Sequence, residues 1–182
     1  MNRFSRERPL MLLLTGISFA GKSILARALS QSMDIPIVDP DTVGHEMGLG
    51  LSGEFLSDEQ WQIIHAEAER RASELLRSGR SIVYDTTSFT ANQRAELVEV
   101  ADASGADALI VFVDTPRELA YARWRENNTS KARFLVHEDD FNSVSDAFER
   151  PTNRENFITY TSDQDPGEWI GTHFSEWQQH RS

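Results

Sequence analysis

The chain has 182 residues, of which 39% are hydrophobic and 26% charged, a balance typical of one globular domain. Its net charge of -11 at pH 7 disfavours a broad nucleic-acid-binding surface, which needs clustered Lys and Arg. It contains no cysteine, which excludes disulfides, thiolate nucleophiles and cysteine-based metal sites, and none of its histidines has a metal-ligand spacing. No apolar stretch is long enough to span a membrane, so we expect a cytoplasmic protein. The length favours one domain over residues 1–182, and we expect a monomer or homodimer.

Short apolar runs recur between longer helical patterns. Five runs are expected to form buried strands: LMLLLTG (10–16), IPIVDPD (35–41), SIVYDTT (81–87), ALIVFVDT (108–115) and NFITYT (156–161). Because these runs lack polar alternation, they are typical of parallel strands that are covered on both faces. Their order predicts an α/β protein, a three-layer α/β/α sandwich around a five-stranded parallel sheet.

Helix signals fill the intervals between the strands. The expected helices cover residues 23–32, 57–79, 90–103, a segment that begins at Thr115, and 166–180. Ser57 and Gln60 form a capping box at the start of the second helix. Thr115 at the N-cap and Pro116 at the first helical position predict the start of the fourth.

The glycine loop GISFAGKS, residues 16–23, follows the first strand and opens the first helix, so it has the spacing and context of a phosphate-binding P-loop. Backbone N–H groups and the helix N-terminus would hold phosphate, Lys22 would reach the β- and γ-phosphates, and Ser23 would bind Mg²⁺. Phe19 replaces a small residue, and we expect it to point away from the phosphates, under a lid or toward the base. The residues expected to contact the nucleotide are Gly16, Ser18, Phe19, Ala20, Gly21, Lys22, Ser23 and Ile24.

Acidic residues end the second, third and fourth strands, where ligands of parallel sheets bind; the acid of the fourth is Asp114. Asp85 ends the third strand and is expected to hold Mg²⁺ through water. Asp39 and Asp41 end the second, and either can orient or deprotonate an acceptor hydroxyl. Since Asp39 precedes Pro40 and has the pattern of a turn, Asp41 is the predicted base.

A basic segment, RWRENNTSKARF, follows the fourth strand's helix. It belongs to a predicted lid at about residues 123–150, where arginines neutralise charge on a transferring phosphoryl group. We expect Arg125 and Arg133 to be catalytic and Arg123 to bind the nucleotide. For Lys131 the alternative of a solvated basic surface stays open.

A second glycine pattern, GLGLSG at 48–53, matches the dinucleotide fingerprint literally. It does not directly follow an apolar strand, and the capping box intervenes before the next helix. The fingerprint requires its glycines in the strand–helix turn itself, so we interpret this segment as a flexible loop near the acceptor pocket.

Together these motifs resemble the P-loop kinases of the polynucleotide-kinase, zeta-toxin and chloramphenicol-phosphotransferase-like group, including the bacterial AAA-domain kinases. The segments that carry the resemblance are GISFAGKS, IVDPD with its acceptor-site acid at Asp41, GLGLSGEFLSDEQW, SIVYDTTSF with Asp85 as the acid of the D-x-T-N element, VFVDTPRELAYARWREN, ARFLVHEDDF and FERPTNRENF. The resemblance covers nearly the whole chain. It implies a nucleoside-kinase-like P-loop NTPase fold with a helical lid, and ATP and Mg²⁺ as cofactors.

Three positions depart from that group. Gly44 replaces an arginine that polynucleotide kinases carry three residues after the acceptor-site acid, Ser88 replaces the asparagine of D-x-T-N, and His137 replaces a lid proline. The first departure argues against 5′-hydroxyl ends of nucleic acid as the acceptor.

The sequence therefore predicts an ATP-dependent phosphotransferase that moves the γ-phosphoryl of Mg·ATP to a hydroxyl of a small acceptor, such as a nucleoside, a nucleotide-sugar or an antibiotic-like molecule. Three alternatives stay open: a nucleotide-binding module or weak ATPase without an acceptor, a polynucleotide 5′-hydroxyl kinase, and a toxin acting on nucleotide-sugars.

Overall fold

A computed structural model describes residues 8–49, 56–130 and 136–178. At its centre lies a sheet of parallel strands in the order β2-β3-β1-β4-β5. The strands are β1 (Leu10–Thr15), β2 (Ile37–Val38), β3 (Ile82–Asp85), β4 (Asp107–Asp114) and β5 (Phe157–Thr161). The predicted five-stranded parallel sheet is confirmed, with β1 at its centre.

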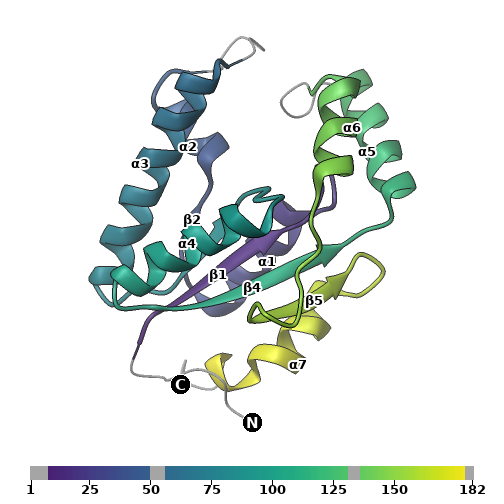
Figure 1. Ribbon diagram of the computed structural model, residues 1–182. Coiled ribbons are helices and arrows are strands. Elements are labelled where there is room, and N and C mark those ends of the chain that lie inside the picture. Colours follow the sequence, from purple (N-terminus) through teal and green to yellow (C-terminus); the bar gives the residue numbers. More distant parts are fainter. Residues whose placement is uncertain (1–7, 50–55, 131–135, 179–182) are drawn as a thin grey trace.

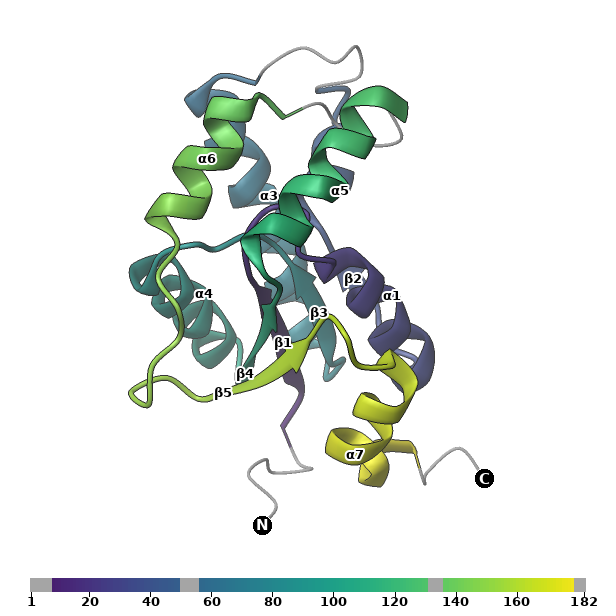
Figure 2. The same ribbon diagram turned by 90° about the vertical axis from the view of Figure 1, so that its right-hand side faces the viewer.

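Helices cover both faces of this sheet, as Figures 1 and 2 show. The helices are α1 (Lys22–Met33), α2 (Pro40–Glu46), α3 (Asp58–Arg77), α4 (Ala91–Ala103), α5 (Arg117–Ser130), α6 (Glu138–Ala147) and α7 (Pro166–Gln178). Helices α1 and α7 pack on one face and α3 and α4 on the other, while α5 and α6 rise as a pair beyond the carboxyl ends of the strands. The three-layer sandwich with a helical lid is therefore confirmed.

Strand β1 divides the core in two because its side chains alternate between the faces of the sheet. Leu10, Leu12 and Leu14 are buried against α1 and α7. Met11 and Leu13 are buried against α3 and α4. A strand with no exposed face has no polar positions, which explains the unbroken apolar run in the sequence.

Local capping signals set two helix starts. The Ser57 hydroxyl accepts a hydrogen bond from the Gln60 amide at 3.2 Å, and the Gln60 side chain accepts one from the Ser57 amide at 2.8 Å. Thr90 and Gln93 form the same reciprocal pair at the start of α4. These capping boxes satisfy amide donors that would otherwise lack partners.

The predicted second strand is too long. Strand β2 ends at Val38, and Asp39 is the N-cap of α2, with its carboxylate accepting from the Asp41 amide at 3.0 Å and the Thr42 hydroxyl at 2.8 Å. Pro40 occupies the first helical position, where its fixed φ and missing N–H favour a helix. Asp41 therefore lies in the first turn of a helix and not at the end of a strand.

Helix α5 begins at Arg117, later than the predicted start with Pro116 as its first residue. Pro116 directly precedes the helix, and its carbonyl accepts from the Ala120 amide at 3.1 Å, so Pro116 and not Thr115 is the residue at the N-cap position. The Thr115 hydroxyl donates to the Ala20 carbonyl in the glycine loop, at 2.8 Å. Among residues 8–49, 56–130 and 136–178, no helix combines the length and the apolar composition that crossing a membrane requires.

Candidate active site

The glycine loop connects β1 to α1 at the centre of the sheet. Gly16 has a φ of +150°, and a Cβ atom there would lie 2.7 Å from the Val113 carbonyl oxygen, so only glycine fits. Gly21, the N-cap of α1, has a φ of +104°. Both glycines shape a loop whose amides and helix N-terminus are available to an anion.

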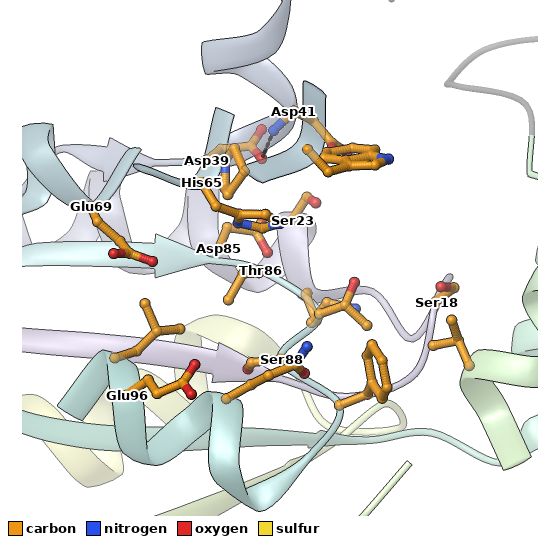
Figure 3. Close-up of a pocket in the computed structure, with 18 of the residues that line it drawn as sticks. Ser18, Ser23, Asp39, Asp41, His65, Glu69, Asp85, Thr86, Ser88 and Glu96 are labelled. Carbon is orange, nitrogen blue, oxygen red and sulfur yellow. Dashed lines mark hydrogen bonds between the residues drawn. The ribbon is translucent and has the colours of Figure 1, made fainter. Parts of the chain in front are cut away.

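Lys22 is buried at the start of α1, and its ammonium group donates to the carbonyls of Gly16 and Ile17, each at 2.9 Å. The side chain thus folds back over the loop that its own helix follows. Ser23, the next residue, is half-buried and lies near the carboxyl end of β3 in Figure 3. A phosphate held by the loop would meet both side chains.

Phe19 lies under the lid, one of the two positions that the sequence left open. Its φ is +61°, and its ring is 6.4 Å from the ring of Phe141 on α6. Ala120 and Trp124 of α5 complete this cluster with Phe141. Phe19, which stands where a small residue is common, is therefore an apolar contact between the loop and the lid, together with Ile17.

Two clefts flank the glycine loop. The first, of about 760 Å³, lies over the carboxyl ends of β3 and β2, and Ser18, Lys22, Ser23, Asp41 and Asp85 are among the residues that line it. The second, of about 780 Å³, lies over β4 and β5 and is lined by Ile17, Asp114–Arg117, Leu119, Ser145, Phe148, Arg150 and Thr161–Asp163. The loop on β1 is shared by both.

Three aspartates and Ser23 gather at one end of the first cleft (Figure 3). Asp85 is buried at the end of β3. Asp41 is open to solvent, yet desolvation within the cleft, reinforced by the carboxylates of Asp39 and Asp85, raises its pKa to about 6 even though Lys22 and His45 oppose the shift. A carboxylate with this pKa is a stronger base than an ordinary aspartate.

The first cleft is also lined by residues that no sequence motif marked. Trp61, His65 and Glu69 line it from α3, and Glu96 lines it from α4, as Figure 3 shows for the labelled three. Burial lowers the pKa of His65, so its imidazole is neutral at pH 7. The i, i+4, i+8 spacing of the three α3 residues places them on one helix face, a signal that the sequence did contain.

The site residues that the sequence predicted on α5, and Ile24 on α1, do not line either cleft. Arg123 donates to the carbonyls of Ala20 at 3.0 Å and Phe19 at 3.3 Å, so it supports the glycine loop from outside both clefts. Arg125 is exposed on α5 and Ile24 is 51% exposed on α1, and neither lines a cleft. Lys131, Arg133 and most of the segment 48–53 lie outside the described residues.

A family model described as an AAA domain matches residues 11–151. The adenylyl-sulfate kinase of Myxococcus xanthus (strain DK1622) is 32% identical over 168 residues, which are 88% of this chain and 85% of that protein. The chain is a P-loop kinase of this AAA-domain family. The kinase is also 31% identical to the adenylyl-sulfate kinase of Aeromonas salmonicida (strain A449), over 82% of its own length and 76% of the relative's.

Solved structures share the fold of the kinase at lower identity. The APS kinase CysC of Mycobacterium tuberculosis, in complex with AMPPNP and APS, superposes with a TM-score of 0.71 at 21% identity over 94% of this chain and 98% of that chain. A gluconokinase from Sinorhizobium meliloti superposes with a TM-score of 0.63 at 15% identity, over 96% of this chain and 94% of that chain. The fold is thus common to kinases named for different acceptors, and it does not by itself identify an acceptor.

Proposed function

We propose that this kinase transfers the γ-phosphoryl group of ATP to a hydroxyl group of a small molecule bound in the first cleft. The observation that carries the proposal is the meeting of the glycine loop with Lys22, Ser23, Asp41 and Asp85 in one cleft. A phosphate donor held by the loop and a carboxylate base would then share one cleft.

The nucleoside of ATP would lie in the second cleft, on the other side of the loop. Arg150 crosses its rim, with its guanidinium 4.8 Å from the centre of the Phe112 ring and paired to Asp114. Phe148 stacks on the same ring at 5.7 Å. These flat groups would favour a planar base, while the loop would hold the phosphates between the two clefts.

Asp41 would act on the acceptor. Its carboxylate takes the proton of the acceptor hydroxyl, whose oxygen then bonds to the γ-phosphorus. The bond from the γ-phosphorus to the β–γ bridging oxygen breaks, ADP leaves with that electron pair, and Asp41 later releases the proton to solvent. Lys22 would turn from its two carbonyl partners to the β- and γ-phosphates.

Ser23 and Asp85 would hold Mg²⁺. A hydroxyl and a carboxylate are oxygen donors, which Mg²⁺ prefers, and the ion takes its other ligands from phosphates and water. When bound, the ion neutralises charge on the phosphates.

The proposal is tested by ADP release with a panel of hydroxyl acceptors. We expect at least one acceptor to stimulate turnover, Lys22→Ala to abolish it, and Asp41→Asn to lower kcat by about 100-fold or more. Asp58→Asn, an exposed acid in the first turn of α3 that lines neither cleft, is the matched control and should retain wild-type turnover. ATP binding without stimulated turnover by any acceptor would contradict the proposal and favour a nucleotide-binding module.

Adenylyl sulfate is a second candidate acceptor, favoured by the 32% identity to the kinase from Myxococcus xanthus. It is therefore included in the panel. A kcat/KM for adenylyl sulfate above that of every other acceptor would establish it.

A further inference from the structure

The first cleft is strongly acidic on its acceptor side. Its lining carboxylates are Asp39, Asp41, Glu69, Asp85 and Glu96. Against them, among the residues that the structure describes, the lining includes one cationic side chain, Lys22, which folds over the glycine loop, and a neutral His65. His45, beside Asp41, lies outside the lining.

Glu69 and Glu96 approach this cleft from different helices, α3 and α4 (Figure 3). Burial and the charge of Glu96 both raise the pKa of Glu69, so the two carboxylates lie close enough to repel each other. Asn92 holds Glu96 in place, with its amide donating to the carboxylate at 2.7 Å. Within the described part of the chain, neither carboxylate forms an ion pair with Arg, Lys or His.

Ser88 supplies an independent sign of a ligand in the same cleft. Its side chain is 6% exposed and lines the cleft, and its hydroxyl has no hydrogen-bond partner. A buried hydroxyl without a partner is unfavourable, and a ligand in the cleft that Ser88 lines would complete its bonding. Trp61 and Phe89 add aromatic surface to the lining. An aromatic wall beside carboxylates suits an organic cation.

Gly44 lies at the contact of α2 with α3 and does not line the cleft. A Cβ atom on Gly44 would lie 2.8 Å from Cδ1 of Ile64 on α3. A side chain at this position would therefore require the Ile64 side chain to move.

We propose that the phosphoryl acceptor is a small polyhydroxylated amine, bound as a cation between Glu69 and Glu96 with the Ser88 hydroxyl as a further hydrogen-bond partner. The inference deepens the proposed function and rests on it. An ammonium group between the two carboxylates replaces their repulsion by two charge-assisted hydrogen bonds. An anionic acceptor would meet like charge in the same place.

The test compares acceptors that differ in charge. The cations are glucosamine and kanamycin, the neutral counterparts are N-acetylglucosamine and fully N-acetylated kanamycin, and the anions are gluconate and adenylyl sulfate. We expect kcat/KM in the ADP-release assay to be at least about tenfold higher for a cation than for its acetylated counterpart. Anions should be the poorest acceptors.

Variants locate the effect. Glu69→Gln and Glu96→Gln should each lower the ratio of cationic to neutral kcat/KM by about tenfold. Glu99→Gln, which removes the same charge from an exposed position on α4 outside the cleft lining, should leave the ratio unchanged. Ser88→Ala should raise the KM for the acceptor and leave the KM for ATP unchanged. Thermal unfolding in the presence of ATP verifies that each variant is folded.

The outcomes separate the two proposals. Turnover that is fastest with adenylyl sulfate, or that is insensitive to acceptor charge, overturns the cationic acceptor and leaves the phosphotransferase standing. ATP binding with no stimulation by any of the six compounds or by the wider panel overturns both.

Discussion

Asp41 lies within electrostatic reach of the carboxylates of Asp39 and Asp85. Its pKa of about 6 in the folded protein compares with 3.8 for an ordinary aspartate. The folded state therefore binds a proton more tightly than the unfolded state, and ionising Asp41 destabilises the fold as pH rises from about 4 through 6. The same shift makes the carboxylate a better base near neutral pH.

Asp41→Asn should consequently stabilise the kinase while it abolishes most activity. Because the carboxylate remains in contact with solvent, screening reduces the gain to about 1 kcal/mol above pH 6. For a chain of this size we expect Tm to rise by about 2–4 °C at pH 7.5. At pH 4 the gain should vanish, since wild-type Asp41 is then protonated in the folded state.

The activity of the wild-type enzyme should depend on pH through the same carboxylate. Its kcat/KM for the acceptor should fall below an apparent pKa near 6, because protonated Asp41 accepts no proton. Thermal scans and a pH–rate profile measure both effects. A lower Tm for Asp41→Asn at pH 7.5 would contradict the electrostatic account of this site.

Helix α2 is seven residues long and depends on its contact with α3 for its position. Gly44 allows the backbones to approach, and Val43 and Ile64 are buried in the same cluster. Asp41 lies one turn before Gly44, so a shift of α2 would move the carboxylate relative to the glycine loop. Displacements of about 1 Å are sufficient to cost 100-fold in rate.

Gly44→Ala should therefore lower acceptor kcat/KM by about tenfold or more and leave ATP binding intact. Its methyl group would collide with Cδ1 of Ile64, at 2.8 Å. Ile64→Val removes that atom at a stability cost of about 1 kcal/mol. The double variant should recover much of the lost activity, which steady-state kinetics on the three variants would measure. Additive losses in the double variant would show that the contact does not position Asp41.

Local signals in the sequence predicted most elements but not all of the site. The capping box of Ser57 and Gln60 and the apolar run of β1 were sufficient because each needs only near neighbours. The start of α2 was missed because Asp39-Pro40 satisfies both a turn and an N-cap. Thr115 was misassigned because α5 begins one residue later than the Thr-Pro pattern indicates, and the bond of its hydroxyl to Ala20 joins residues distant in the sequence.

Local sequence signals did not predict which residues line the proposed acceptor end of the cleft. Glu69 and Glu96 belong to different helices, and each by itself has the pattern of a solvated surface charge. Only the packing of α3 beside α4 makes them face one cleft. The hydroxyl of Ser88 was likewise visible as a departure from a motif, but its burial without a partner is a property of the fold.

A buried ion pair joins α4 to the segment that precedes β5. Arg94 of α4 is fully buried, and its guanidinium binds the Glu155 carboxylate just before β5, with distances of 2.6 and 3.1 Å. It also donates to the Ser88 carbonyl at 3.4 Å. Burial is the largest single influence on the pKa of Glu155 and raises it, but the hydrogen bond and charge of Arg94 together with the hydrogen bond from the Thr152 amide outweigh burial, so the pKa lies below its usual range.

Glu155→Gln should destabilise the whole domain by about 3 kcal/mol, because it leaves the Arg94 charge buried without its counterion. Since the folded pKa of Glu155 is lowered, the stabilisation by this pair is present above about pH 4.5 and is lost as pH falls through the lowered pKa. The difference between wild type and variant should shrink accordingly in acid. Chemical denaturation at several pH values measures it.

The exposed pair of Arg70 and Glu74 provides the control for that measurement. Both side chains are more than half exposed, so Glu74→Gln should change the free energy of unfolding by less than about 1 kcal/mol. If Glu74→Gln and Glu155→Gln lowered the free energy of unfolding equally, the burial of Arg94 would not be the reason that its pair with Glu155 stabilises the domain.

The place of β1 at the centre of the sheet has a consequence for how such enzymes diversify. The glycine loop faces one cleft over β4 and β5 and another over β2 and β3, so different segments of the chain build the two. Changes in α2, α3 and α4 can then alter what is phosphorylated while the phosphate donor stays the same. Under the proposed assignment of the clefts, a graft of these three helices between kinases of this fold would carry acceptor preference with it.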